Sequence, residues 1–278
     1  MICLNGKEVK INHFPDGTLL IKEFASGEAE IEWKFENNEE LVVLIFITKH
    51  LRSHGVTDIV LVMPYIPNAR QDRVKKDEDV FTLKYFSEVI NSLNFKRVEV
   101  LDPHSSVSAA LIDRIDIKSP VGYIERAIDR IGDSDLIVFY PDEGSVKRYS
   151  DLIVKPYAFG IKNRDWATGE IKGLTVINNG NDIKGRNILI VDDISSRGGT
   201  FYYSAKALHE LGAGSIYLYV THCENTILEG KVLEGDLIKQ VFTTDSLFTG
   251  RHDKIKTFGV FCSKLVDARE RFKGDFDD

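Results

Sequence analysis

The 278-residue sequence lacks several features that would assign it to a class at once. It has no apolar run of about 18 residues, so we expect no membrane span. Its first residues, MICLNGKEVKINHF, do not follow the charged-then-apolar plan of a secretory signal. Its three cysteines, Cys3, Cys223 and Cys262, are scattered and form no CxxC pair. This pattern predicts reduced, partly buried cysteines and a cytoplasmic protein.

Basic residues are fewer than acidic ones, and the formal net charge at pH 7 is −7. A broad nucleic-acid-binding surface is therefore not expected, although local basic clusters can still bind small anions. Neither G-x-x-x-x-G-K-[ST] nor G-x-G-x-x-G occurs, which excludes a P-loop and a dinucleotide-binding fingerprint. What remains is a globular composition, with 43% hydrophobic and 28% charged residues, and a length sufficient for one large domain or two ordinary ones.

Short apolar runs alternate with segments of helical periodicity. The runs are nearly continuous in apolar residues, as is typical of strands buried on both faces of a parallel sheet. The predicted strands are 58–65, 97–104, 136–144, 187–193 and 215–222. The predicted helices are 39–55, 82–95, 145–154 and 199–214. This alternation predicts an α/β fold.

Polar residues stand where the predicted strands end. Ligands of open α/β sheets collect at the carboxyl ends of the strands, so this edge is expected to carry the chemistry. The residues there are Tyr65, Asp102, His104, Asp142, Asp192, Asp193 and His222. Periodicity is weakest over 116–125, which indicates a boundary between a first domain over 1–121 and a second over 122–278.

The stretch ILIVDDISSRGGT, residues 188–200, is the most informative segment. A strand runs into two acids and a glycine loop, and an amphipathic helix follows. Backbone N–H groups at a helix start, uncrowded beside Gly198 and Gly199, form an anion cradle. Two adjacent carboxylates suit the vicinal hydroxyls of a sugar, so a sugar phosphate is the natural ligand. The alternative is an ordinary strand–turn–helix, whose acids are favoured by the helix dipole.

This stretch resembles the phosphoribosyl diphosphate-binding loop of phosphoribosyltransferases and ribose-phosphate diphosphokinases. The second family fits better, because further segments match its motifs in order between about residues 12 and 272. These segments are HFPDGTL (13–19), PYIPNARQDRVKK (64–76), VLDPHSS (100–106), PDEGSVKRYS (141–150), IKNRDWATGEI (161–171) and GAGSIYLYVTH (212–222).

The resemblance implies two phosphoribosyltransferase-type domains, each a mainly parallel sheet flanked by helices. A C-terminal helix could pack back on the first domain. The implied reaction is ATP-dependent: the C1 hydroxyl of ribose 5-phosphate attacks the β-phosphorus of Mg²⁺-bound ATP, and phosphoribosyl diphosphate and AMP form. The implied partners are small molecules and further copies of the chain, with no nucleic acid and no membrane. Such transfer depends mostly on positioning and charge stabilisation.

The resemblance also assigns roles to individual residues. Lys162 and Arg164 match the catalytic cations on a hairpin, whose turn we expect at DWATG (165–169). His104 and Asp142 match a Mg²⁺-linked pair; Mg²⁺ prefers oxygen, so the histidine could act through water. The residues matching the ATP site are Phe14, Asp16, Arg70, Gln71, Arg73 and His104. Those matching the ribose and phosphate site are Asp192, Asp193, Ser195, Ser196, Arg197, Gly198, Gly199 and Thr200. Phe14 and Asp16 belong to a loop that the family lends to a neighbouring subunit, which implies an oligomer.

Three features depart from the family pattern. The chain begins almost directly at the F-P-D-G loop, which makes the usual hexamer and its allosteric phosphate/ADP site less expected. Thr18 replaces a glutamate that reads adenine, so the preference for ATP is expected to be looser. Ser196 and Arg197 replace an Asp-Thr pair, which exchanges one negative charge for a positive one in the phosphate loop.

The sequence leaves several functions open. With an arginine suited to bidentate phosphate contact, the loop could hold the monoester of ribose 5-phosphate or a 5-diphosphate acceptor such as ADP-ribose. A phosphoribosyltransferase would share the loop at 192–200 but has no need of ARQDR or of the Lys162 and Arg164 hairpin. A non-catalytic regulatory homologue would be expected to lose the catalytic cations or metal ligands, which are present here. No general base can be named.

Overall fold

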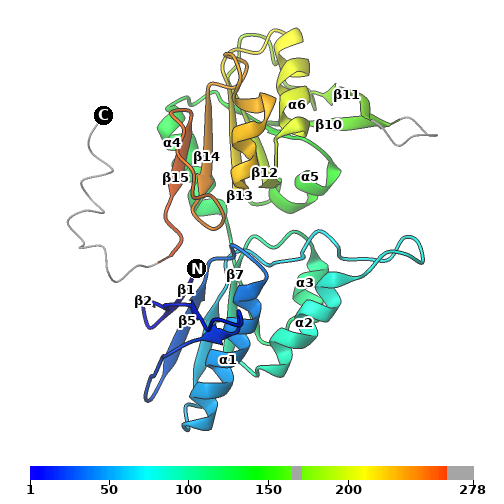
Figure 1. The fold of residues 1–278 in the computed structure, drawn as a ribbon. Coiled ribbons are helices and arrows are strands. Elements are labelled where there is room, and N and C mark those ends of the chain that lie inside the picture. The colour runs from blue at the N-terminus through cyan, green and yellow to red at the C-terminus, as the bar shows by residue number, and fades with distance from the viewer. Residues whose placement is uncertain (165–170, 262–278) are drawn as a thin grey trace. The chain divides into compact units, whose positions relative to one another are not determined.

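A computed structural model describes residues 1–164 and 171–261, with side chains at all of these except 162–164 and 171–173. The chain divides into two units, each with its own sheet and core (Figure 1). The first unit comprises Met1–Lys118 and the described residues from Val260 onward, and the second comprises Ser119–Gly259. The predicted C-terminal helix lies outside the described residues, as does Cys262.

The first unit is built on a six-stranded sheet in the order β2-β1-β5-β6-β7-β8. The strands from β5 to β8 are parallel, whereas β1 pairs antiparallel with β2 and β5. Its strands are β1 (Ile2–Leu4), β2 (Lys7–Glu8), β5 (Ala29–Trp33), β6 (Ile59–Val62), β7 (Arg97–Leu101) and β8 (Ile115–Lys118). A separate hairpin joins β3 (Asn12–His13) to β4 (Leu19–Leu20). The helices of this unit are α1 (Glu39–Ser53), α2 (Thr82–Ser92) and α3 (Ser106–Leu111).

Helix α1 illustrates why these elements form. Val43, Leu44, Ile47 and Leu51 recur at the spacing of one helix face, and all four are buried in the core of the first unit. The helix ends just before Gly55, whose φ of 83° is a left-handed conformation that favours glycine. The predicted helix over 39–55 is thus confirmed to within two residues at its end.

The second unit contains a seven-stranded sheet in the order β11-β10-β9-β12-β13-β14-β15. All neighbours are parallel except β10 and β11, which form an antiparallel hairpin. The strands are β9 (Ile137–Tyr140), β10 (Tyr157–Arg164), β11 (Ile171–Ile177), β12 (Ile188–Ser195), β13 (Ile216–Cys223), β14 (Gln240–Thr244) and β15 (Ile255–Phe258). The helices are α4 (Val121–Ile131), α5 (Glu143–Tyr149) and α6 (Gly199–Glu210), with 3-10 turns η1 (Asn225–Glu229) and η2 (Lys231–Leu233).

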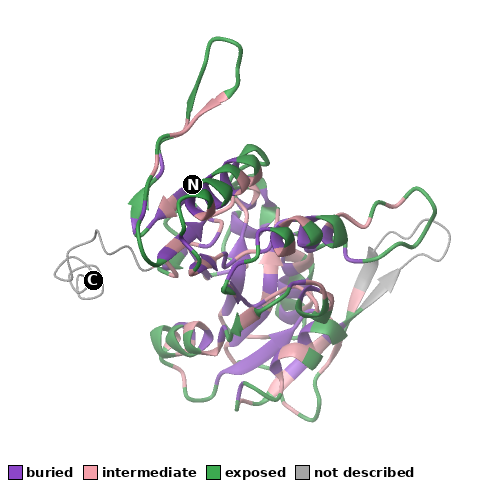
Figure 2. Cartoon of the chain, turned by 90° about the horizontal axis from the view of Figure 1, so that it is seen from below, coloured by how far each residue is buried: buried purple, intermediate pink, exposed green. Residues whose placement is uncertain are grey.

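Strand β12 shows how helices cover both faces of this sheet. Ile188 and Ile190 belong to a core cluster that includes Leu208 of α6. Leu189 and Val191 belong to a different cluster, which includes Ile124 and Ala127 of α4. Successive side chains of a strand point to opposite faces, so α6 covers one face and α4 the other. Figure 2 shows the buried strands between more exposed helices.

The predicted α/β fold, with a mainly parallel sheet in each of two units, is confirmed. Each of the five predicted strands and four predicted helices corresponds to an observed element. Helix α4 was not predicted, and it begins inside the segment 116–125 whose periodicity is weak. Over the part of the chain that the structure describes, no helix has the length and apolarity needed to cross a membrane.

Candidate active site

The two adjacent acids of ILIVDDISSRGGT lie near the carboxyl end of β12, as predicted. Val191 and the residues before it are fully buried in the sheet, Asp193 is buried and Asp192 is partly exposed. The register pairs Ile190 with Phe139 of β9, which ends at Tyr140, so the acids stand just past the carboxyl end of that neighbouring strand. This is the edge at which open α/β sheets bind their ligands.

Ser145 connects this strand end to the start of α5. Its Oγ donates to Oδ1 of Asp192 at 2.7 Å and lies 3.2 Å from Oδ1 of Asp142. Asp142 caps α5, because its Oδ1 also accepts the Ser145 backbone N–H at 3.1 Å. A hydroxyl has one proton to donate, and the shorter contact assigns it to Asp192. Two predicted site residues, Asp142 and Asp192, are therefore brought together by a serine.

Asp192 and Asp193 have different partners. Oδ2 of Asp193 lies 2.7 Å from Nη1 of Arg148, and the backbone N–H of Asp193 donates to Asp192. Burial, followed by the charges of Asp193 and Asp142, raises the pKa of the Asp192 carboxyl well above its usual value, although the bond from Ser145 opposes this. The negative charge of Asp192 would thus be stabilised by a hydroxyl donor or a cation placed beside it.

The glycine loop passes directly from these acids into α6. Gly198 has a φ of 72° and caps the helix, and a side chain there would collide with Val232. Gly199, by contrast, faces open space, so its backbone is accessible at the helix start. The predicted anion cradle of backbone N–H groups is compatible with this geometry.

Arg197, at the tip of the loop, is paired with a carboxylate that the sequence did not single out. Its Nη2 lies 3.0 Å from Oε2 of Glu229, the last residue of η1. Gly230 packs so closely on the backbone carbonyl of Arg197 that a side chain at Gly230 would overlap it. The positive charge that the sequence adds to the loop is therefore balanced by Glu229.

The predicted hairpin carrying Lys162 and Arg164 is present as β10 and β11. The register pairs Lys162 with Leu174 and Arg164 with Ile171, and it shifts between Asn163 and Arg164. The expected turn at DWATG lies outside the described residues. The catalytic roles of Lys162 and Arg164 stay predictions.

In the first unit, Asp72 organises the ARQDR segment. The buried carboxylate of Asp72 accepts two bonds from Arg73, at 2.7 Å and 3.0 Å. The bond from Arg73, more than the nearby charge of His104, lowers the pKa of Asp72 below its usual value. Thr82, at the start of α2, donates to Oε1 of Gln71 at 2.9 Å. Sequence reasoning named Gln71, Arg73 and His104 but missed Asp72, which orients the Arg73 guanidinium.

The loop containing Phe14 and Asp16 connects β3 to β4. Phe14 and Asp16 are exposed, and Asp16 accepts bonds from the Thr18 backbone at 3.0 Å and the Thr18 hydroxyl at 2.7 Å. These bonds lower the pKa of Asp16. Thr18, which stands where the family has a glutamate, therefore fixes the aspartate that the resemblance assigns to ATP.

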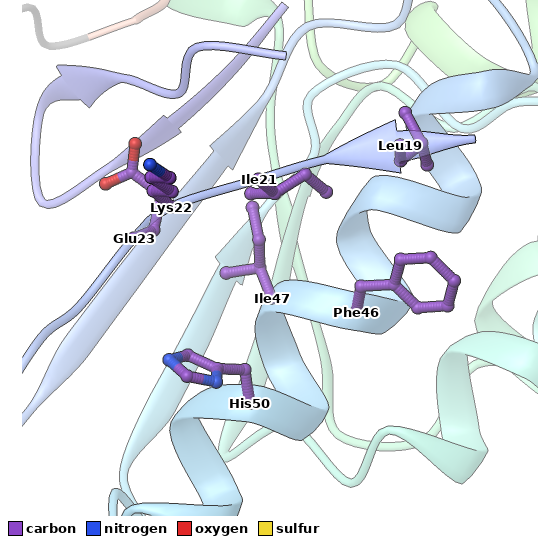
Figure 3. A pocket seen from close by; sticks show the side chains of 7 residues that line it. All are labelled: Leu19, Ile21, Lys22, Glu23, Phe46, Ile47 and His50. Carbon is purple, nitrogen blue, oxygen red and sulfur yellow. The ribbon is translucent and has the colours of Figure 1, made fainter. Parts of the chain in front are cut away.

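Strand β4 borders a cavity of about 450 Å³ in the first unit. Leu19, Ile21, Phe46 and Ile47 give it an apolar wall between β4 and α1, and Lys22, Glu23 and His50 stand beside them (Figure 3). None of the residues described as lining this cavity is a predicted site residue. It therefore adds nothing to the site.

The predicted metal-linked residues, His104 and Asp142, belong to different units. Within residues 1–164 and 171–261, no three His, Cys, Asp or Glu side chains gather as a metal site. The oxygen donors of Asp142 and Asp192 nevertheless suit Mg²⁺, which binds few carboxylates and is shared with substrate phosphates. The crowding of negative charge at Asp192 fits a divalent cation nearby, since such an ion would offset it.

Four residues important to this geometry were not predicted: Asp72, Ser145, Arg148 and Glu229. Ser145 had a partial signal, because an aspartate before a helix is a preferred N-cap, and its oxygen accepts the backbone N–H of the residue three positions on, which is Ser145. Glu229 had none, because it meets Arg197 only through the folding of η1 against the loop.

Comparisons with known proteins agree with this architecture. The family model described as the phosphoribosyl transferase domain matches residues 126–247. The model described as the N-terminal domain of ribose phosphate pyrophosphokinase matches residues 31–93. The second unit thus has the fold of the phosphoribosyltransferase class.

Two curated relatives extend the match over most of the chain. A ribose-phosphate pyrophosphokinase of Thermococcus kodakarensis is 31% identical over 224 residues, covering 77% of each chain. One from Mycoplasma genitalium is 29% identical over 278 residues, covering 93% of this chain and 82% of the relative. A solved phosphoribosylpyrophosphate synthetase from Mycobacterium smegmatis superposes with a TM-score of 0.77 at 20% identity, covering 91% of this chain and 86% of that one.

The chain belongs to the ribose-phosphate pyrophosphokinase family, and it is an enzyme of that type. The predicted family membership and the two phosphoribosyltransferase-type domains are thereby confirmed.

Proposed function

We propose that the enzyme transfers the β,γ-diphosphate of ATP to the C1 hydroxyl of ribose 5-phosphate. The new bond joins the C1 oxygen to the β-phosphorus, and the bond from that phosphorus to the α,β-bridging oxygen breaks. AMP leaves with the bridging oxygen, and the hydroxyl proton passes to solvent. The products are phosphoribosyl diphosphate and AMP.

The observation that carries this proposal is the succession of Asp192, Asp193 and the loop around Gly198 at the start of α6. Asp192, crowded by negative charge, is suited to accept a hydrogen bond from a ribose hydroxyl. The Asp193 carboxylate is held by Arg148, and the backbone N–H of Asp193 donates to the Asp192 carboxylate. The N–H groups at the open helix start are suited to the 5-phosphate.

For ATP, we propose Arg70, Gln71, Arg73 and His104 of the first unit, with Phe14 and Asp16 acting on a neighbouring subunit of a homo-oligomer. Lys162 and Arg164 are proposed to stabilise charge on the transferring diphosphate, which is the main requirement of such transfer. Bound Mg²⁺, held with the help of Asp142 and His104, would neutralise phosphate charge. Asp142 is preorganised for this role by the bond it accepts from the Ser145 backbone N–H.

A second acceptor is favoured by one observation. Arg197 adds a guanidinium to the loop that would hold the acceptor's 5-phosphate, and arginine suits bidentate phosphate contact. An acceptor that carries a 5-diphosphate, such as ADP-ribose, would use the same chemistry at C1. Its product would be ADP-ribose with a diphosphate at C1.

The test is AMP release from Mg²⁺ and ATP by the purified protein, with ribose 5-phosphate and ADP-ribose in separate reactions. Turnover with ribose 5-phosphate alone supports the first acceptor, and turnover with ADP-ribose alone supports the second. If no AMP is released in either reaction, both proposed acceptors are contradicted. Replacing Lys162 with alanine then separates an enzyme from a regulatory homologue, since only an enzyme loses turnover while it keeps substrate binding.

A further inference from the structure

The ion pair between Arg197 and Glu229 is open to solvent. The side chains of Arg197 and Glu229 keep 72% and 63% of their surface exposed, and a single 3.0 Å contact joins them. Exposed pairs of this kind contribute little to stability. A ligand phosphate can therefore displace Glu229 from Arg197 at little cost.

The position of Glu229 is nevertheless fixed by the backbone on either side of the pair. Gly230 packs against the carbonyl of Arg197, and Val232 packs against Gly198. The buried side chains of Ile227 and Val232 anchor η1 and η2 in the core of the second unit. The backbone that carries Glu229 is thus held beside the loop, and its exposed side chain stays within reach of Arg197.

This arrangement places a negative charge at a loop proposed to bind an anion. Arginine has five N–H donors, and the pair with Glu229 engages one nitrogen, so Arg197 keeps donors for a phosphate. Any phosphate that Arg197 contacts lies near Glu229 as well. The attraction from the guanidinium is then partly cancelled by repulsion from the carboxylate.

We propose that Glu229 is a specificity-determining residue, which weakens the binding of an acceptor in proportion to the charge on its loop-bound phosphate. This inference rests on the proposed function of the loop. The 5-phosphate of ribose 5-phosphate carries nearly two negative charges at neutral pH, since its second pKa is about 6. The corresponding phosphate of a 5-diphosphate acceptor carries one. Glu229 therefore penalises the monoester more than the diphosphate ester.

Coulomb's law gives the size of the effect. At about 7 Å in a water-like dielectric, each pair of unit charges repels by about 0.6 kcal/mol, or about 3-fold in binding. Glu229→Gln should therefore tighten ribose 5-phosphate about 7-fold and ADP-ribose about 3-fold. Because the charges are exposed, both gains should shrink between low salt and about 0.5 M salt.

The experiment measures the Kd of ribose 5-phosphate and of ADP-ribose by calorimetry, without ATP, for the wild type and for Glu229→Gln. Glu234→Gln is the matched control, because it removes the same charge from an exposed position after η2. AMP release is measured in parallel. The expected result is a tighter Kd in Glu229→Gln, larger for ribose 5-phosphate, with kcat and the KM for ATP little changed.

The outcomes separate the two proposals. Turnover in the wild type with no change of Kd in Glu229→Gln, or an equal change in Glu234→Gln, overturns the role of Glu229 and leaves the function standing. A selective change of Kd without AMP release from any variant overturns the function and supports the role of Glu229. The absence of both binding and turnover overturns both.

Discussion

Ser145 on α5 donates a hydrogen bond of 2.7 Å to Asp192 at the end of β12, and it contacts Asp142 at 3.2 Å. One buried hydroxyl thus links a carboxylate that the family resemblance assigns to ribose with one that it assigns to Mg²⁺. Asp142 and Asp192 lie far apart in the sequence, yet both contact Ser145. Movement of either carboxylate therefore disturbs a contact of the other. Positioning of the acceptor and of the metal is expected to be coupled through Ser145.

Replacing Ser145 with alanine tests this coupling. The variant loses the bond to Asp192, and a lost hydrogen bond of this kind costs about 0.5–1.5 kcal/mol, or roughly 2- to 12-fold in binding. We expect the KM for the acceptor and the Mg²⁺ concentration for half-maximal rate both to rise. Steady-state kinetics with each varied in turn measures the two effects.

Ser87→Ala is the control for loss of a buried serine, because the Ser87 hydroxyl donates to the Leu83 carbonyl within α2. It should change stability slightly and neither kinetic constant. A rise in the acceptor KM of Ser145→Ala with an unchanged Mg²⁺ requirement would show that the two carboxylates act independently.

Replacing Asp72 with asparagine tests how Arg73, the arginine proposed to bind ATP, is oriented. The buried carboxylate of Asp72 holds Arg73 by two bonds, and asparagine offers neither the charge nor two acceptor oxygens. We expect the KM for ATP to rise and the free energy of unfolding to fall by about 1–3 kcal/mol. Kinetics with ATP varied and denaturant unfolding measure these changes.

The stability loss in Asp72→Asn also has a predicted pH dependence. The folded-state pKa of Asp72 is lowered, so its contribution is present above the unfolded pKa and disappears as pH falls through the folded pKa. The difference from the wild type should therefore vanish in acid. Asp77→Asn, an exposed change in the same segment, is the control; an equal rise in its KM for ATP would contradict the role of Asp72.

Replacing Gly230 with alanine tests the support behind the loop that is proposed to bind phosphate. The added methyl group overlaps the carbonyl of Arg197, which is backbone and can yield only if the loop moves. Overpacking of this kind typically costs about 1–3 kcal/mol. We expect lower stability, a higher acceptor KM and an unchanged KM for ATP, measured by thermal unfolding and kinetics.

Gly199→Ala is the stability control for Gly230→Ala, since the position faces open space without a left-handed φ. Its melting temperature should stay close to that of the wild type. If Gly230→Ala unfolds at the wild-type temperature with an unchanged acceptor KM, the segment around Gly230 does not support the loop.

The sequence predicts the parts of the site that depend on local pattern. The run from Ile188 to Val191 predicts a strand buried on both faces, and Gly198 with Gly199 predicts a turn into a helix, because these signals act over a few residues. Helix α4 is missed because Pro120 and Gly122 stand at its start and obscure its apolar spacing.

The pairings across the site could not be predicted in the same way. Arg148 reaches Asp193, and Glu229 reaches Arg197, only because β12 is packed against α5 and η1 is folded behind the loop. Such contacts depend on tertiary packing, and a single sequence carries no local signal for them. The sequence therefore predicts which charges the loop contains, whereas the structure identifies what neutralises them.

The last prediction concerns the cost of gathering negative charge at Asp192. Its folded-state pKa is raised by burial and then by the charge of Asp193, so the folded state holds a proton that the unfolded state has released. Stability must then fall as pH rises from the unfolded pKa through the folded one.

Asp192→Asn removes this penalty and keeps an oxygen to accept the bonds from Ser145 and from the Asp193 backbone. In EDTA, we expect the variant to melt at the wild-type temperature in acid and above it at higher pH, by about 2–4 °C for each kcal/mol relieved. Acceptor binding should be lost at the same time, because the carboxylate that destabilises the free protein is the one proposed to bind the ribose hydroxyl. A variant that melts below the wild type at every pH would contradict this account, since Asp192 would then stabilise the folded state rather than destabilise it.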